Sequence, residues 1–290
     1  MPGKARRQLS RPWDAYVRRA LLALCLWLAG AGGALACRFP PHLANDFRRE
    51  SFVMQPGCDG QWQTACAVKG ITAAWYEMPT GRYAHGVLGD AIEGGRLTVY
   101  TDATSDSCGT KSVTLDAAHV FEDTAPRLAD LDGDGDVEVI TVRSHRDLGA
   151  QLAIWDDNAD KTLRLIAATP YIGMRNRWLA PLGAADLDGD GQVEIAYVDR
   201  PHLVKTLRIW RYAAGALTEV ATFPGVTNHR IGETDIAGGL RDCAGGPEMI
   251  VADSGWQSML ALRFDGSGIE ARRIGTDTSR AAFALALSCR

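Results

Sequence analysis

The sequence lacks the short signatures by which many enzymes are identified. It contains no G-x-S-x-G nucleophile elbow, no P-loop and no H-E-x-x-H zinc motif. It has no C-x-x-C pair, which argues against a structural zinc site. Its most apolar stretch, residues 20–30, is too short to span a bilayer as a helix. We therefore expect neither a transmembrane protein nor one of the enzyme classes that carry these motifs.

Basic runs, low-complexity tracts and linkers are also missing. The 290 residues include 31 Lys and Arg against 35 Asp and Glu, a net charge of −4. An acidic chain without a basic patch is poorly suited to nucleic acid or to an anionic membrane. The length after the N-terminal segment fits one domain, which we place at residues 37–290.

The first 36 residues have the pattern of a secretory signal peptide. Basic residues precede the apolar stretch, and Ala34-Leu-Ala36 fits a cleavage site. We expect export to the periplasm of a Gram-negative bacterium or secretion from it. Without the six basic residues and one acidic residue of this segment, 25 basic and 34 acidic residues remain, a net charge of −9. Cys37, directly after the cleavage site, leaves open a lipid anchor.

Cysteine is scarce, but its number after the signal is even. Six cysteines remain, and an even number in an exported chain indicates disulfides. Cys58 and Cys66 fit a hairpin staple. We expect Cys289, near the C-terminus, to bond to the body of the domain, with Cys243 as the favoured partner.

Two copies of one acidic loop are the most informative feature. Each has a Gly at position 6 and oxygen-bearing side chains at positions 1, 3, 5, 7 and 9: Asp130, Asp132, Asp134, Asp136 and Glu138, then Asp186, Asp188, Asp190, Gln192 and Glu194. Calcium takes six to eight oxygens, and the Gly permits the sharp turn between them. We predict calcium in both loops, with position 7 giving its backbone carbonyl. A solvated acidic turn is the alternative.

These loops differ from an EF-hand, which needs a bidentate Glu at position 12 and a helix on either side. Position 12 is Thr141 in one copy and Tyr197 in the other. The residues after each loop are rich in β-branched and aromatic types, which favour strands. The sequence therefore predicts calcium loops between strands.

The loops recur because the chain repeats. Asp130 and Asp186 are 56 residues apart, and Glu194 and Glu248 are 54 apart. The clearest unit predicts four strands, at residues 178–185, 193–198, 206–212 and 217–223. Repeated four-stranded units without amphipathic helices between them predict an all-β fold, a β-propeller of about five blades. We expect strands at residues 269–274 and 281–287 to begin a last blade that residues 51–70 complete, which would close the ring.

The segment Ala129-Asp-Leu-Asp-Gly-Asp-Gly135, continuing to Glu138 between strands, resembles the FG-GAP/VCBS repeat, the blade of integrin-α-type propellers. The resemblance covers residues 120–270 well and residues 70–115 weakly. It implies a propeller, calcium in the blade loops and residence outside the cytoplasm, but no single activity. The chain is most similar to small single-propeller proteins of Gram-negative bacteria. The third loop departs from the pattern, so that only weak metal binding is expected from Asp235, Asp242 and Glu248.

Basic side chains recur before the innermost strand of successive units, a position that converges on the propeller axis. The pattern is compatible with a polar pocket for an anionic or polyhydroxyl ligand, formed by Arg82, His85, Arg175, Arg177, His229 and Arg230. The interpretation we favour is that these residues hydrogen-bond neighbouring blades and cap turns. A second set, which includes Arg200 and His202, follows the second strands and is interpreted as solvated loop tips.

Two function classes follow. The first is a calcium-stabilised binding module for a protein or carbohydrate partner. The second is a periplasmic or secreted hydrolase or lyase that uses the Arg/His cluster near the axis. Propellers host both classes, so the fold does not decide between them. We favour the module, because no paired acid and base is evident.

Overall fold

The computed structural model describes residues 51–55, 70–101, 109–157 and 163–290. The described residues belong to one compact unit, Cys37–Arg290. The expected signal peptide, Cys37, Cys58 and Cys66 lie outside the described residues. Within the ranges described, no helix is long and apolar enough to cross a membrane.

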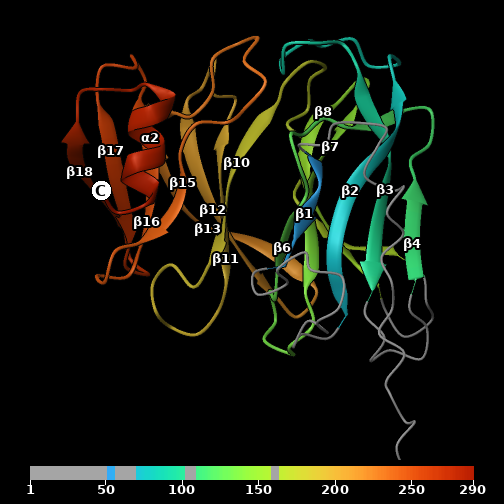
Figure 1. The fold of residues 1–290 in the computed structure, drawn as a ribbon, viewed down its shortest axis with the longest axis horizontal. Coiled ribbons are helices and arrows are strands. Elements are labelled where there is room, and N and C mark those ends of the chain that lie inside the picture. The colour runs from blue at the N-terminus through green and yellow to red at the C-terminus, as the bar shows by residue number, and fades with distance from the viewer. Residues whose placement is uncertain (1–50, 56–69, 102–108, 158–162) are drawn as a thin grey trace, which may run out of the picture. The chain divides into compact units, whose positions relative to one another are not determined.

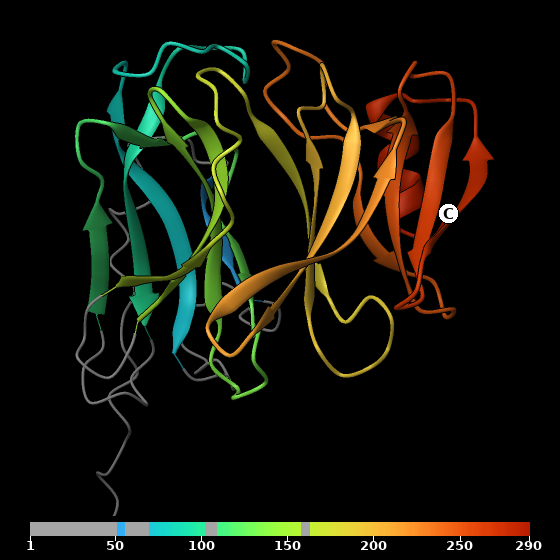
Figure 2. The same cartoon turned by 180° about the vertical axis from the view of Figure 1, so that it is seen from behind.

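The described chain is built from antiparallel strands (Figures 1 and 2). They form three hydrogen-bonded sheets of nine, four and five strands. The nine-stranded sheet contains two of the four repeat units, which are joined by one residue pair, Gly94 opposite Phe121. The first unit contains β1 (Val53–Met54), β2 (Ile71–Thr80), β3 (Glu93–Thr101) and β4 (Gly109–Thr114). The second contains β5 (His119–Phe121), β6 (Arg127–Ala129), β7 (Glu138–His145), β8 (Gly149–Asp156) and β9 (Arg164–Ala168). The third contains β10 (Leu179–Ala185), β11 (Glu194–Asp199), β12 (Thr206–Ala213) and β13 (Ala216–Pro224). The fourth contains β14 (Val226–Thr227), β15 (Gly239–Asp242), β16 (Pro247–Asp253), β17 (Met259–Phe264) and β18 (Ile269–Gly275).

The inner strand differs between units. In the third unit β10 pairs with β11 along its whole length, with one irregularity between Pro181 and Gly183. In the second and fourth units the same role is split between two short strands, β5 and β6 on β7, and β14 and β15 on β16. The four strands predicted at residues 178–223 are thus confirmed as β10–β13.

The core lies between successive sheets. Adjacent residues of a strand point to opposite faces, so each central strand serves two interfaces. The adjacent pairs that divide between two buried clusters in this way are Val139 and Ile140 in β7, Ile195 and Ala196 in β11, and Met249 and Ile250 in β16. The third-strand aromatic residues Trp155 and Phe264 are buried in this packing, and Trp210 at the matching position is partly buried.

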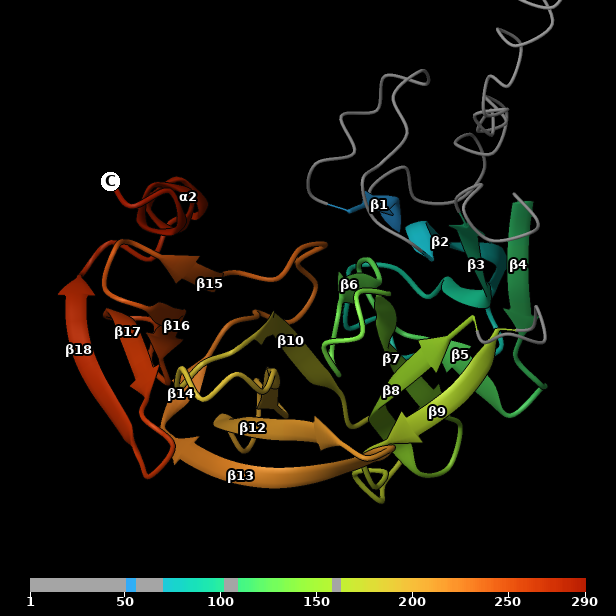
Figure 3. The ribbon, with the colours of Figure 1, turned by 90° about the horizontal axis from the view of Figure 1, so that it is seen from below.

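The C-terminal segment corrects the sequence prediction. Residues 281–287 form a helix, α2 (Arg280–Leu287), not a strand. Ser279 caps its start, with Ser279 Oγ accepting a hydrogen bond from Ala282 N. The segment has no β-branched residue and is rich in Ala and Leu, the best helix formers. Phe283 and Ala286 pack with Ile250 and Ala261. The helix therefore lies against the last sheet (Figure 3).

The expected ring closure is also wrong in its pairing. The described part of residues 51–70, β1, pairs with β2 of the first unit, Val53 opposite Ala74. The strand β18 does not begin a new blade but forms the outer strand of the fourth unit, Ile269 opposite Phe264. The fourth unit has its own inner strands, so it needs none from the N-terminus. The described strands form four units, and their sheets do not establish a closed ring of five blades.

The expected disulfide between Cys243 and Cys289 is confirmed. It joins the turn between β15 and β16 to the second residue after α2, with Cα atoms 5.6 Å apart. Arg241 Nη1 also donates to Ala286 O at 3.0 Å. The helix is therefore attached to the last sheet by a covalent bond, a polar contact and apolar packing.

Candidate functional site

The two acidic loops share one conformation. Asp130 accepts hydrogen bonds from Gly133 N at 2.7 Å and Gly135 N at 3.1 Å, and Glu138 accepts one from Leu131 N at 2.7 Å. The second loop repeats each bond at 2.8, 3.0 and 2.9 Å, through Asp186, Gly189, Gly191, Glu194 and Leu187. The glycines adopt positive φ between 79° and 88°, which a side chain would disfavour. Backbone hydrogen bonds and glycine therefore set the turn in both copies.

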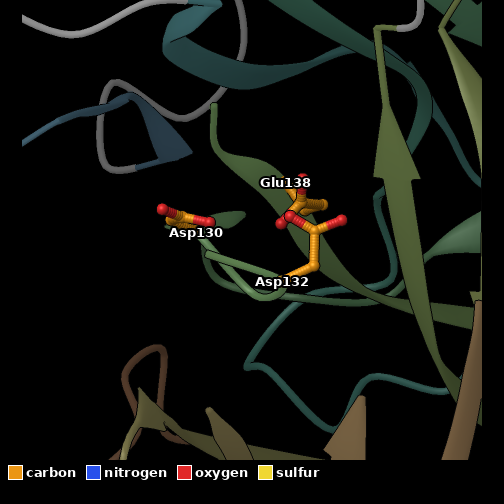
Figure 4. A group of neighbouring side chains, drawn as sticks. All are labelled: Asp130, Asp132 and Glu138. Carbon is orange, nitrogen blue, oxygen red and sulfur yellow. The ribbon is translucent and has the colours of Figure 1, made fainter. Parts of the chain in front are cut away.

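The turn brings three carboxylates of each loop together. Oxygens of Asp130, Asp132 and Glu138 lie within 4.8 Å of one another (Figure 4), as do those of Asp186, Asp188 and Glu194. Two oxygens that share a calcium ion at about 2.4 Å can be at most about 5 Å apart. The donor set consists of hard oxygens, as calcium and magnesium prefer. These residues fit a divalent cation. The carboxylates of the predicted ligands Asp134, Asp136 and Asp190 are not part of either group. The backbone carbonyls expected from Asp136 and Gln192 stay a prediction.

The first loop concentrates negative charge around a buried carboxylate. Glu138 is only 3% exposed. Burial raises the pKa of Glu138 to about 8, and the carboxylates of Asp132, Asp156 and Asp130 add to the rise against the hydrogen bond from Leu131 N. Since Asp156 lies at the end of β8, the repulsion includes a residue outside the loop. A cation at this position would offset both the burial and the repulsion.

The second loop contains an internal cation. Arg211 of β12 lies opposite Glu194 in the sheet. Its guanidinium is 2.5 Å from Glu194 Oε1, 2.8 Å from Asp188 Oδ2 and 2.9 Å from Asp190 Oδ2. Burial raises the pKa of Glu194, and hydrogen bonds from Leu187 N and Arg211 oppose that rise.

The third loop has replaced the acidic cluster with ion pairs. Arg241 is 2.6 Å from Glu248 Oε2, and Arg272 is 2.9 Å from Glu248 Oε1. Burial alone would raise the pKa of Glu248, but these two guanidinium groups hold it below its usual value. Asp235 is 2.9 Å from Arg280. Among the residues with described side chains, the suggested weak ligands Asp235, Asp242 and Glu248 do not form a carboxylate group.

A separate cavity lies at the other ends of the strands. Its volume is about 260 Å³, and it is lined by His85, Asn176, Arg177, Trp178, Arg200, Pro201, His202, Leu203 and Ile231. Thus it joins His85 and Arg177, predicted for a pocket, with Arg200 and His202, which were interpreted as loop tips. The available signal was that basic residues stand at matching places in the repeats, but this did not show that the two sets meet.

The other predicted pocket residues lie elsewhere. Arg82 donates to His119 O at 2.8 Å, and Arg230 stacks 3.6 Å above the Trp256 ring. Arg175 is exposed and does not line the cavity. His229 is buried behind the lining residue His202, with His202 Nε2 and His229 Nδ1 2.9 Å apart.

One lining residue, His85, is oriented by a buried acid. His85 Nδ1 lies 2.5 Å from Glu122 Oε1, and Ser144 Oγ donates to Glu122 Oε2 at 2.5 Å. Glu122 is fully buried, and this burial raises its pKa against the bonds from His85 and Ser144. Ser144 is itself buried and bonded to Glu122, so it is not a nucleophile facing the cavity. With its Nδ1 bonded to Glu122, His85 has Nε2 left for a ligand.

Four-stranded antiparallel units with acidic turns between their first two strands define a repeat β protein. Residues 130–197, which include both acidic loops, match the family model of the FG-GAP-like repeat. The chain therefore contains an FG-GAP-like repeat, as the sequence resemblance indicated. No curated protein matches the chain.

Proposed function

We propose that this protein is an exported interaction module whose repeat loops bind calcium, and that the cation is structural. The observation that carries the proposal is the clustering of three carboxylates within 4.8 Å at the turn of each of two repeats. A cation held there would neutralise the loop and fix the turn between the first two strands of a unit. The partner would be a protein or a carbohydrate.

Export is supported by the covalent chemistry of the chain. Disulfides persist mainly in oxidising compartments, and Cys243–Cys289 is one. Expression in a Gram-negative host tests this point. Periplasmic recovery with an N-terminus at Cys37 is the expected result, and an unprocessed cytoplasmic chain would contradict it.

Calcium binding is tested by melting the purified protein with calcium and with EDTA. A ligand that binds only the folded state contributes about 2.7 kcal/mol at 100 times its Kd. For a domain of this size this raises Tm by about 5 to 10 °C. Equal melting temperatures, with no calcium found by elemental analysis, would refute calcium binding. Asp132→Asn should abolish the shift if the first loop holds the ion.

The cavity supports a second candidate function, the binding of a small anion with an apolar body. Arg177 donates to Asn176 O at 3.1 Å and, among described residues, has no carboxylate partner. Arg200 is paired with Asp199, whereas the exposed Leu203 and Ile231 supply apolar surface at the cavity. This arrangement offers one unpaired cation, the Nε2 of His85 and an apolar wall.

Benzoate and its neutral analogue benzamide test this candidate by calorimetric titration. Benzoate should bind the wild-type protein and benzamide should not, because only the carboxylate pairs with Arg177. Arg177→Gln should abolish binding, and the matched control Arg175→Gln, two residues away and outside the cavity, should retain it. Equal binding of both compounds, or no binding of benzoate, would exclude the anion site.

A further inference from the structure

The residue opposite the buried glutamate differs in charge between the three repeats. In the second repeat, Glu194 pairs with Arg211 across β11 and β12. In the first repeat, Val139 pairs with Trp155, so the next position places Asp156 beside Glu138. In the third repeat, Met249 pairs with Leu262, which places Arg263 beside Glu248. One structural position therefore carries an acid once and a base twice.

In the second repeat this base already occupies the carboxylate group. Arg211 contacts Glu194 and Asp188, two of the three members of the candidate metal group, and also Asp190. Its side chain is 20% exposed, so the ion pairs are partly shielded from water. A cation entering this loop would have to displace a charge-assisted, multiply bonded guanidinium.

In the first repeat no such competitor is found among the described residues. No Lys or Arg in those ranges is ion-paired with Asp130, Asp132 or Glu138. Asp156 is not a member of the carboxylate group, but the register places it beside Glu138, at the position that Arg211 holds in the second repeat. An acid thus replaces a base at this position, a difference of two formal charges between the repeats.

We propose that Arg211 closes the second repeat to calcium by serving as the built-in cation of its carboxylate group, so that of the two acidic loops only the first, where Asp156 stands in place of the arginine, is open to the ion. The third repeat completes the series, since Arg241 and Arg272 neutralise Glu248 there. This inference rests on the proposed calcium binding. It adds which of the two acidic loops binds calcium and names Arg211 as the residue that prevents binding in the other.

Calcium equivalents per chain, measured by equilibrium dialysis on the full-length protein, test the inference. The wild-type protein should bind one equivalent tightly, and the second loop should bind on the order of 100-fold more weakly, because a nearby positive charge opposes the ion. Asp132→Asn should remove the tight equivalent, whereas Asp188→Asn should leave it in place. The opposite assignment would overturn the inference.

Two reciprocal substitutions test the deciding position. Arg211→Asp should create a second tight equivalent, and Asp156→Arg should abolish the first. Arg211→Gln removes the guanidinium without adding a negative charge and should raise the calcium affinity of the second loop at least tenfold. This variant keeps the test informative if Arg211→Asp does not fold. Arg208→Gln, on the same strand but paired with Asp199 and Glu219, is the matched control and should still bind one equivalent.

The outcomes separate the two claims. If the wild-type protein binds no calcium, the proposed function itself is refuted. Two equal equivalents in the wild-type protein would leave that function standing and overturn the role of Arg211. One equivalent that neither Arg211→Gln nor Asp156→Arg alters would also overturn it.

Discussion

Removal of the Cys243–Cys289 disulfide should destabilise the protein strongly, because this bond closes a long loop around the last sheet. The two cysteines are separated by 46 residues. In the chain-entropy treatment a loop of this length restricts the unfolded chain by about 4 kcal/mol at 25 °C. For a domain of this size we expect Tm to fall by about 8 to 16 °C in a variant with both cysteines replaced by serine.

The assay is a thermal melt of the wild type and of the Cys243→Ser/Cys289→Ser variant, each with and without reductant and in excess calcium. Reductant should lower the wild-type Tm by at least the difference between the two oxidised proteins. Any shift that reductant causes in the variant belongs to other disulfides, so the variant is the internal control. If the oxidised variant melts within about 2 °C of the wild type, the disulfide does not stabilise the attachment of α2, and the reasoning fails.

Three further predictions concern the same sheet and the cavity. Phe283→Ala should cost about 3 to 5 kcal/mol in chemical denaturation, because Phe283 is 2% exposed and fills the contact between α2 and the last sheet; an unchanged denaturation midpoint would show that the helix does not stabilise the fold. Arg241→Ala should cost about 1 to 3 kcal/mol near neutral pH by removing a partner of the buried Glu248 carboxylate, and a smaller loss in Arg241→Ala/Glu248→Gln than in the single variant would confirm the cause. Burial, with His229 nearby, lowers the pKa of His202 to about 4, so the unfolded chain binds a proton at a higher pH than the folded protein does. Tm should therefore fall as the pH drops from about 6.5 toward 4. If the fall of Tm with pH is the same in His202→Gln, other groups cause it.

The regular part of the fold could be predicted because its signals are local. The strands at residues 178–223 follow from β-branched runs and turn glycines, and they match β10–β13. The C-terminal helix could not be separated from a strand by apolar pattern alone, because short runs of Ala, Leu and Phe satisfy both periods. Ser279 as a cap and the absence of β-branched residues were the signals that favoured a helix.

The assignment of residues 51–70 to the last blade failed for a related reason. The count of repeats treated residues 269–274 as the start of a unit, whereas β18 ends one by pairing with β17. Once that strand is assigned to the fourth unit, no open blade is left for the N-terminal segment to complete. The face of the last sheet is instead covered by α2, which buries Phe283 and Ala286.

The acidic loops could be located from sequence to the residue, but their difference in charge could not. The spacing of Asp and Gly encodes a turn that glycines and Asp-to-backbone hydrogen bonds hold, and both copies have the same bonds. That turn forms equally well whether the charge is neutralised by an ion or by Arg211. Arg211 lies on β12, the second strand after the loop, and only the sheet register places it opposite Glu194 of β11.

It follows that the loop motif by itself indicates a geometry rather than a bound metal. In each repeat the buried glutamate needs a positive charge, and the chain has three arrangements for it. The first repeat leaves Glu138 among carboxylates, which favours an external cation. The second supplies Arg211, and the third supplies Arg241 and Arg272 for Glu248. When the next repeat of this kind is interpreted from sequence, the residue of the third strand that the register places opposite the buried glutamate should be inspected together with the loop, since an acid there favours the ion and an arginine replaces it.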